Sequence, residues 1–112
     1  MNSYRMQITV QMFGTYELKD SVINELSDNV LSQHYATDQY VHLGYVLGSY
    51  SGDIDGLKSD LHSFLVRHRE IYYIDVMYLQ DDIRSFAPQR FVIWRDGRER
   101  DYHTRISFEE VD

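Results

Sequence analysis

Residues 4–17 place the strongest constraint on the fold, because apolar and polar side chains alternate there at every second position. The apolar row consists of Tyr4, Met6, Ile8, Val10, Met12 and Tyr16. A period of two residues is that of a β-strand, whose successive side chains point to opposite faces of the sheet. The polar row between them predicts a sheet with one covered face and one face in water, as antiparallel sheets commonly have.

Two later segments have helical periodicity. Apolar side chains recur every three or four residues over 22–31 and again over 54–68. Asp20 and Asp53 are the predicted N-caps, since a carboxylate at that position accepts hydrogen bonds from the free amides of the first helical turn. The first helix is expected to run to about residue 34.

Strand spacing returns over 40–50 and 71–79, and a hairpin follows. The segment 71–79 is apolar on both faces except at Asp75, which predicts a central strand and a partly buried carboxyl with a raised pKa unless an arginine lies near. The order βαβαβββ predicts one α+β domain over residues 1–112. Its architecture would be a two-layer sandwich, with two helices packed on one face of a five-stranded, mainly antiparallel sheet.

Composition narrows the class of protein. The chain has 112 residues and no cysteine, so it must bury its own core without disulfides or thiolate-bound metal. The absence of cysteine fits a reducing compartment. No signal peptide and no apolar run of membrane-spanning length is visible, which predicts a soluble, cytoplasmic protein with no membrane contact.

The pair Asp96-Gly97 predicts a hairpin with a two-residue type I′ turn, because both central positions of that turn need a positive φ. The pairing that follows from this turn assigns to the core face Phe91, Ile93, Tyr102, Thr104, Ile106 and Phe108. The opposite face would carry Trp94, Val92, Glu99, Asp101, Arg90 and His103. A tryptophan on a face in water either packs across its neighbouring strands or meets a partner.

Charge is segregated along the chain. Residues 84–108 hold six arginines and three acids, whereas residues 1–83 hold five basic and twelve acidic side chains. This sorting favours recognition of a partner over chemistry. The candidate contacts in the hairpin are Trp94, Arg90, Arg95, Arg98 and Val92. The candidate contacts in the acidic part are Glu25, Asp28 and Asp38, for which helix capping and a solvated helix face are the simpler interpretation.

Several functions find no support in the sequence. The five histidines lack the spacing of common metal ligands, and no nucleophile motif or glycine-rich phosphate loop is present. No cofactor, no metal and no enzymatic activity are therefore predicted. Direct nucleic-acid binding is disfavoured because the net charge of −7 repels a polyanion and because acids interleave with the hairpin arginines.

The sequence predicts a protein-binding module. Its strongest form is a small acidic stoichiometric inhibitor, of the general kind found in phages and mobile elements, that imitates nucleic acid and occludes a basic nucleic-acid-processing enzyme. The alternative is a regulatory α+β domain with a small-molecule site between sheet and helices. A homodimer is also predicted, through the strand face around Trp94 or through an unpaired edge at residues 4–13.

Overall fold

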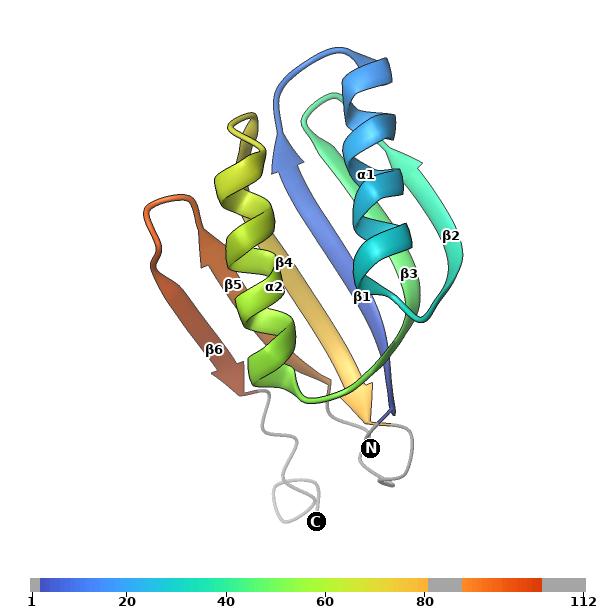
Figure 1. Ribbon diagram of the computed structural model, residues 1–112, viewed down its shortest axis with the longest axis vertical. Helices are drawn as coiled ribbons and strands as arrows, with labels where there is room; N and C mark the ends of the chain where they lie inside the picture. Colours follow the sequence, from blue (N-terminus) through green and yellow to red (C-terminus); the bar gives the residue numbers. More distant parts are fainter. Residues whose placement is uncertain (1–2, 81–87, 104–112) are drawn as a thin grey trace, which may run out of the picture.

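Six antiparallel strands form one sheet, and two helices cover one of its faces in the computed structural model, which describes residues 3–80 and 88–103 (Figure 1). This arrangement confirms the predicted two-layer α+β sandwich, with six strands in place of five. The elements are β1 (Ser3–Met12), α1 (Tyr16–Val30), β2 (Gln33–Gln39), β3 (Leu43–Ser51), α2 (Ile54–Arg67), β4 (Ile71–Gln80), β5 (Gln89–Trp94) and β6 (Glu99–His103).

The strand order in the sheet is β2-β3-β1-β4-β5-β6. The first six elements follow the order βαββαβ, which is the split βαβ or ferredoxin-like arrangement, and the β5–β6 hairpin extends the sheet beyond β4. The predicted order βαβαβββ was wrong because it lacked β2. This strand lies at the sheet edge with six of its seven side chains exposed, so its sequence has no alternation of apolar and polar residues.

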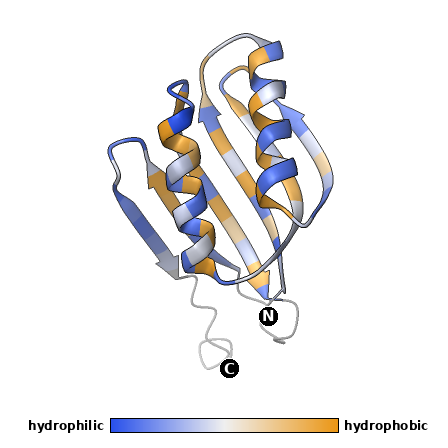
Figure 2. Ribbon diagram, in the orientation of Figure 1, coloured by the Kyte–Doolittle hydropathy of each residue, from blue (hydrophilic) through white to orange (hydrophobic). Residues whose placement is uncertain are grey.

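The core lies between the sheet and the two helices. In Figure 2, hydrophobic positions alternate along the central strands, whereas β6 is hydrophilic along most of its length. β1 lies between β3 and β4, so the predicted unpaired edge at residues 4–13 is wrong. β4 pairs with both β1 and β5, which confirms the predicted central place of residues 71–79. The apolar row of β1 is buried against the helices, with Ile8 and Val10 fully covered.

The two helix starts test the predicted caps. Asp53 caps α2 as predicted, and its carboxylate accepts from the amide of Gly56 at 2.5 Å. Thr15 caps α1 in place of Asp20, with its hydroxyl accepting from the amide of Leu18 at 3.1 Å. The difference arises because β1 ends at residue 12, so the helix begins a full turn before Asp20.

The hairpin register differs by one residue from the predicted pairing. The amide of Gly97 (φ 91°) donates to the carbonyl of Trp94 at 3.0 Å, and the amide of Trp94 donates to the carbonyl of Arg98 at 2.9 Å. Trp94 therefore lies opposite Arg98 across a three-residue loop, in which glycine takes the left-handed position. A shift of one residue moves every side chain of β6 to the other face of the sheet.

Three predictions for the hairpin change with this register. Glu99 pairs with Ile93 and Asp101 pairs with Phe91, so both acids face the helices. Tyr102 pairs with Arg90 on the face that neither of the two described helices covers, called the open face below. The remaining predicted core residues of the hairpin, Thr104, Ile106 and Phe108, lie outside the described part of the chain.

Candidate functional site

Three of the predicted hairpin contacts are engaged within the molecule. Arg95 donates to the backbone carbonyls of Leu65 and Ile71, at 2.9 and 2.5 Å, and to that of His68. It thereby joins the hairpin to the C-terminal end of α2 and the start of β4. Val92 is buried, with 4% of its surface exposed, although it lies on the open face.

The third engaged residue is Arg90, which forms a bidentate ion pair with Asp75 on the neighbouring strand. Its Nε lies 2.9 and 3.0 Å from the two carboxylate oxygens and its Nη2 lies 2.5 Å from one of them. These hydrogen bonds raise the pKa of Arg90. The pair supplies the arginine that was predicted as a possible partner of Asp75.

Trp94 and Arg98 remain accessible and lie together. The Arg98 guanidinium is 5.1 Å from the centre of the Trp94 ring and 2.6 Å from a carboxylate oxygen of Asp96. Hydrogen bonds from Arg98 lower the pKa of Asp96. Trp94 is half-buried beneath this arginine. Packing against its cross-strand neighbour therefore explains the position of Trp94 at least as well as a role in binding a partner.

The predicted acidic contacts do not form one face. Glu25 lies between the helices, 2.6 Å from His68 and 3.8 Å from Arg67. Asp28 is exposed on α1, and Asp38 lies on the edge strand β2, where its carboxylate accepts from the amide of Gln39. Helix capping and ion pairing between the helices account for Asp53 and Glu25.

Sequence reasoning missed a cluster of exposed hydrophobic side chains at one end of the sheet. We call it the aromatic end, and it consists of Phe13, Tyr16, Leu18, Tyr40, Val41 and Tyr72. These six residues are between 40% and 63% exposed and come from the β1–α1 connection with the first turn of α1, the β2–β3 turn and the start of β4. All three regions lie at the upper end of the view in Figure 1.

Ring contacts and backbone hydrogen bonds hold these connections together. The Phe13 ring lies 5.2 Å from the ring of His42 and 5.1 Å from that of Tyr72, with edge-on geometry in both cases. The amide of Met12 donates to the carbonyl of His42 at 3.0 Å, and the amide of Phe13 donates to that of Glu70 at 3.1 Å. The exposed rings therefore project from backbone segments that are hydrogen-bonded to one another.

The buried side chain of Lys19 holds the β2–β3 turn of the aromatic end in place. Its side chain is almost fully buried, and its Nζ donates to the carbonyls of Tyr40 and Val41 at 2.9 and 2.7 Å. The same ammonium lies 4.4 Å from the centre of the Tyr16 ring. A buried ammonium needs such partners, so these contacts order the β2–β3 turn against α1.

Acidic side chains border the aromatic end on the side of α1 and β2. Glu17 and Asp20 are exposed on the first turns of α1, and Asp20 accepts from the amide group of Gln39 at 2.6 Å. Asp38 lies close enough to the Tyr40 ring to influence its hydroxyl. Tyr45, whose ring stacks on Tyr40 at 6.1 Å, and Asp38 together raise the pKa of Tyr40.

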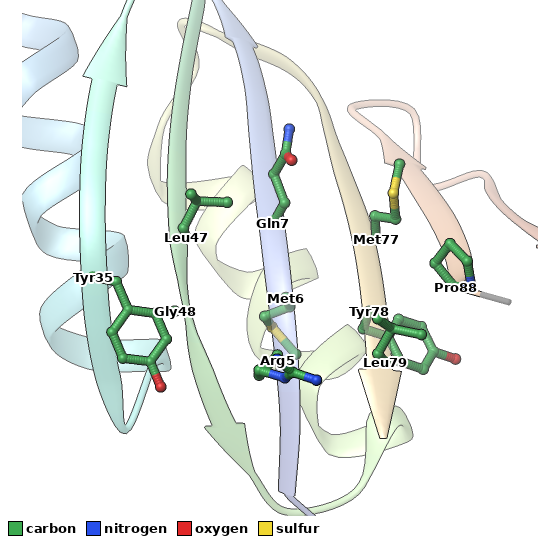
Figure 3. Close-up of a pocket in the computed structure, with 10 residues that line it drawn as sticks. All are labelled: Arg5, Met6, Gln7, Tyr35, Leu47, Gly48, Met77, Tyr78, Leu79 and Pro88. Atoms are coloured by element: carbon green, nitrogen blue, oxygen red, sulfur yellow. The ribbon is translucent and has the colours of Figure 1, made fainter. Parts of the chain in front are cut away.

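A separate groove of about 320 Å³ crosses the open face of the sheet (Figure 3). Tyr35 and Leu47 border it on one side, and Met77 and Pro88 border it on the other. The predicted alternative placed a small-molecule site between sheet and helices, where the core side chains pack. The largely apolar groove found here lies on the opposite face of the sheet.

Across residues 3–80 and 88–103, no group of three or more histidine or acidic side chains is placed to hold a metal ion. Neither of the two helices in the same ranges has the length and apolar character needed to span a membrane.

Comparisons with known proteins assign no family. No protein-family model matches the chain, and no curated protein matches it. Among solved structures, the crystal structure of PH0061 aligns with a TM-score of 0.46 and 21% identity, over 74% of this chain and 55% of that one. The chain thus spans about half the length of that similar protein.

Proposed function

We propose that this protein is a non-enzymatic protein-binding module that docks through the aromatic end. The observation that supports the proposal is the gathering of six large hydrophobic side chains, each at least 40% exposed, on connections at one end of the sheet. Contiguous exposed apolar patches with a polar border are typical of protein interaction sites. Tyrosine and phenylalanine are also enriched at the centre of such interfaces.

The rigidity of the aromatic end favours binding. Tyr40 and Val41 are held through their carbonyls by Lys19, and the Phe13 ring is in contact with His42 and Tyr72. A surface that is already ordered loses little conformational entropy on association, so more of its contact energy becomes affinity.

The acidic border points to a basic partner. Glu17, Asp20 and Asp38 would face cationic side chains around the docked rings, and complementary charge accelerates association. Enzymes that process nucleic acids carry basic surfaces for phosphates. We therefore propose a stoichiometric inhibitor that occludes such an enzyme.

The test begins with capture of a partner from the native host at low salt, followed by titration of the purified partner. We expect one-to-one binding that weakens with salt. Tyr72→Ser and Val41→Ser should each lower the affinity about tenfold or more if these residues are interface hot spots. The matched control is Val66→Ser, since Val66 is 79% exposed on α2 and lies outside the aromatic end.

Two results would contradict the proposal. The first is that no protein survives low-salt washing. The second is a purified partner whose affinity falls equally with Val66→Ser and Tyr72→Ser. Charge reversal by Asp38→Lys should slow association, whereas Asp55→Lys on α2 serves as the control for net charge alone.

A further inference from the structure

The open face of the sheet has opposite charges at its two edges and a largely apolar hollow at its centre. We propose that two copies of the chain pack with their open faces together, about a two-fold axis that runs along the strands between β1 and β4. The strand order is β2-β3-β1-β4-β5-β6, so this axis passes through the middle of the sheet. Each strand then faces its counterpart in the reversed order: β2 faces β6 of the second copy, and β1 faces β4.

One row of paired residues crosses the whole sheet and carries a charge at each end. In strand order, its members are Asp38, Tyr45, Thr9, Asp75, Val92 and Arg100. The row lies on the open face, because Thr9 alternates along β1 with the fully buried Ile8 and Val10. Asp38 and Arg100 are exposed at opposite edges of the six-stranded sheet, about 24 Å apart. They are therefore too far apart to pair within one chain.

Neither end charge of this row is neutralised within the described part of the chain. The Asp38 carboxylate accepts from the amide of Gln39 at 2.8 Å. The Arg100 guanidinium lies 4.9 Å from the centre of the Tyr102 ring. Over residues 3–80 and 88–103, neither of the two charged side chains forms an ion pair. Each copy therefore offers one uncompensated carboxylate and one uncompensated guanidinium at opposite edges of the same face.

These two charges select the direction of the axis. With the axis along the strands, each row faces the same row of the second copy in reverse order. Asp38 then faces Arg100 of the second copy, and the symmetry forms this contact twice. With an axis at right angles to the strands, Asp38 would face Asp38 and Arg100 would face Arg100. Like charges oppose association, so the charge pattern favours the axis along the strands.

The hollow at the centre of the open face fits the same axis. Gln7 pairs with both Leu47 and Met77 in the neighbouring row, and Figure 3 shows these two side chains on either side of Gln7. The axis places Met77 of the second copy above Gln7, in the hollow of about 320 Å³ that these side chains border. Leu47 and Met77 are 36% and 41% exposed, so both would become buried. Methionine is flexible and fills irregular hollows well.

The area of the face is sufficient for a specific dimer. Strands about 4.8 Å apart and about 20 Å long give a six-stranded face of roughly 600 Å². Two copies would bury about 1,200 Å² in total, which is the lower limit for stable interfaces between proteins. We therefore expect a reversible dimer with a Kd in the micromolar range.

Sedimentation equilibrium over a range of concentrations tests the assembly. The wild-type chain should show a monomer–dimer equilibrium. Met77→Glu should raise the Kd at least about tenfold, because the two-fold axis puts two carboxylates into the interface. Leu47→Glu tests the other wall of the hollow in the same way. Val66→Glu on α2 is the matched control and should leave the Kd unchanged, since Val66 is 79% exposed on the helix layer.

Charge exchange tests the axis. Asp38→Arg and Arg100→Asp should each raise the Kd about tenfold, because each variant creates two contacts between like charges. The double variant Asp38→Arg/Arg100→Asp should restore the wild-type Kd, since both contacts form again with their signs exchanged. If the axis lay at right angles to the strands, each single variant would only exchange one repulsion for another and would leave the Kd unchanged.

Three results would overturn the proposal. They are a wild-type chain that stays monomeric at every concentration, a dimer that folded Met77→Glu and Leu47→Glu leave intact, and a double charge variant that fails to restore the Kd. Thermal unfolding of each variant separates loss of assembly from loss of folding. Tyr72→Ser should leave the dimer intact, and Met77→Glu should leave binding at the aromatic end intact, so this proposal and the proposed function can fail separately.

Discussion

The hairpin and the aromatic end differ in how their side chains are engaged. In the hairpin, Arg95 is bound to three carbonyls and Arg90 to a carboxylate, so two conspicuous charges stabilise the fold itself. At the aromatic end, Tyr16, Val41 and Tyr72 are more than half exposed. The hairpin is prominent in the sequence, whereas the aromatic end becomes a surface only after folding.

This difference shows that a charged residue is a poor indicator of a contact surface until its partners are known. An arginine can satisfy several backbone carbonyls at once through its five donors, and it is then a structural residue. The aromatic side chains of the aromatic end also make internal ring contacts, yet about half of the surface of Phe13, Tyr40 and Tyr72 stays exposed. The comparison can be tested by removing the residues that support each surface.

The largest effect is expected from Lys19→Ala, which removes the support of the aromatic end. The variant loses two charge-assisted hydrogen bonds and leaves space in a buried site, which should lower the free energy of unfolding by about 3 kcal/mol. Urea unfolding followed by circular dichroism measures this change. Lys19→Met keeps most of the side-chain volume and should recover about half of the lost stability. If Lys19→Ala left the free energy of unfolding unchanged, the β2–β3 turn would not depend on this lysine.

Arg95→Ala should produce the next largest effect. The hairpin loses its hydrogen bonds to the end of α2 and to β4, and partial exposure of this arginine limits the expected destabilisation to about 2 kcal/mol. The measurement is again urea unfolding. A cost no larger than that of Arg98→Ala would contradict the structural role of Arg95.

The hairpin register predicts a measurable coupling between Lys58 of α2 and Asp101 of β6. Their charged groups lie 2.8 Å apart, with 14% and 49% of the two side chains exposed, so a double-mutant cycle to alanine should give a coupling of about 0.5 kcal/mol. In the register of a two-residue turn, Asp101 would lie on the open face. The coupling would then be absent.

The smallest effect is expected for Arg98→Ala. Arg98 and Asp96 form a pair at the hairpin tip with 71% and 56% of their side chains exposed, and such pairs contribute little to stability. We expect a change of about 0.3 kcal/mol or less in unfolding free energy, together with altered Trp94 fluorescence from loss of the cation above its ring. A large destabilisation would mean that Arg98 stabilises the fold as strongly as Arg95 does.

Much of the fold could be predicted from local patterns. The alternation in β1 and the helical stripes of α1 and α2 each reflect one element with one buried face, so they are visible in a short window of sequence. Asp75 and its arginine partner could also be anticipated, because a carboxyl in an apolar strand needs a cation. β2 could not be predicted, since an exposed edge strand leaves no pattern of burial.

The sequence by itself determined the two layers, the central place of residues 71–79 and the separation of acidic and basic segments, because these properties depend on neighbouring residues in the chain. Only the tertiary structure decided the face on which Glu99, Asp101 and Tyr102 lie, since the Gly97 loop moved the register by one residue. It also brought together residues from 13 to 72 at the aromatic end. Such a surface depends on contacts between residues far apart in sequence, and no local periodicity records them.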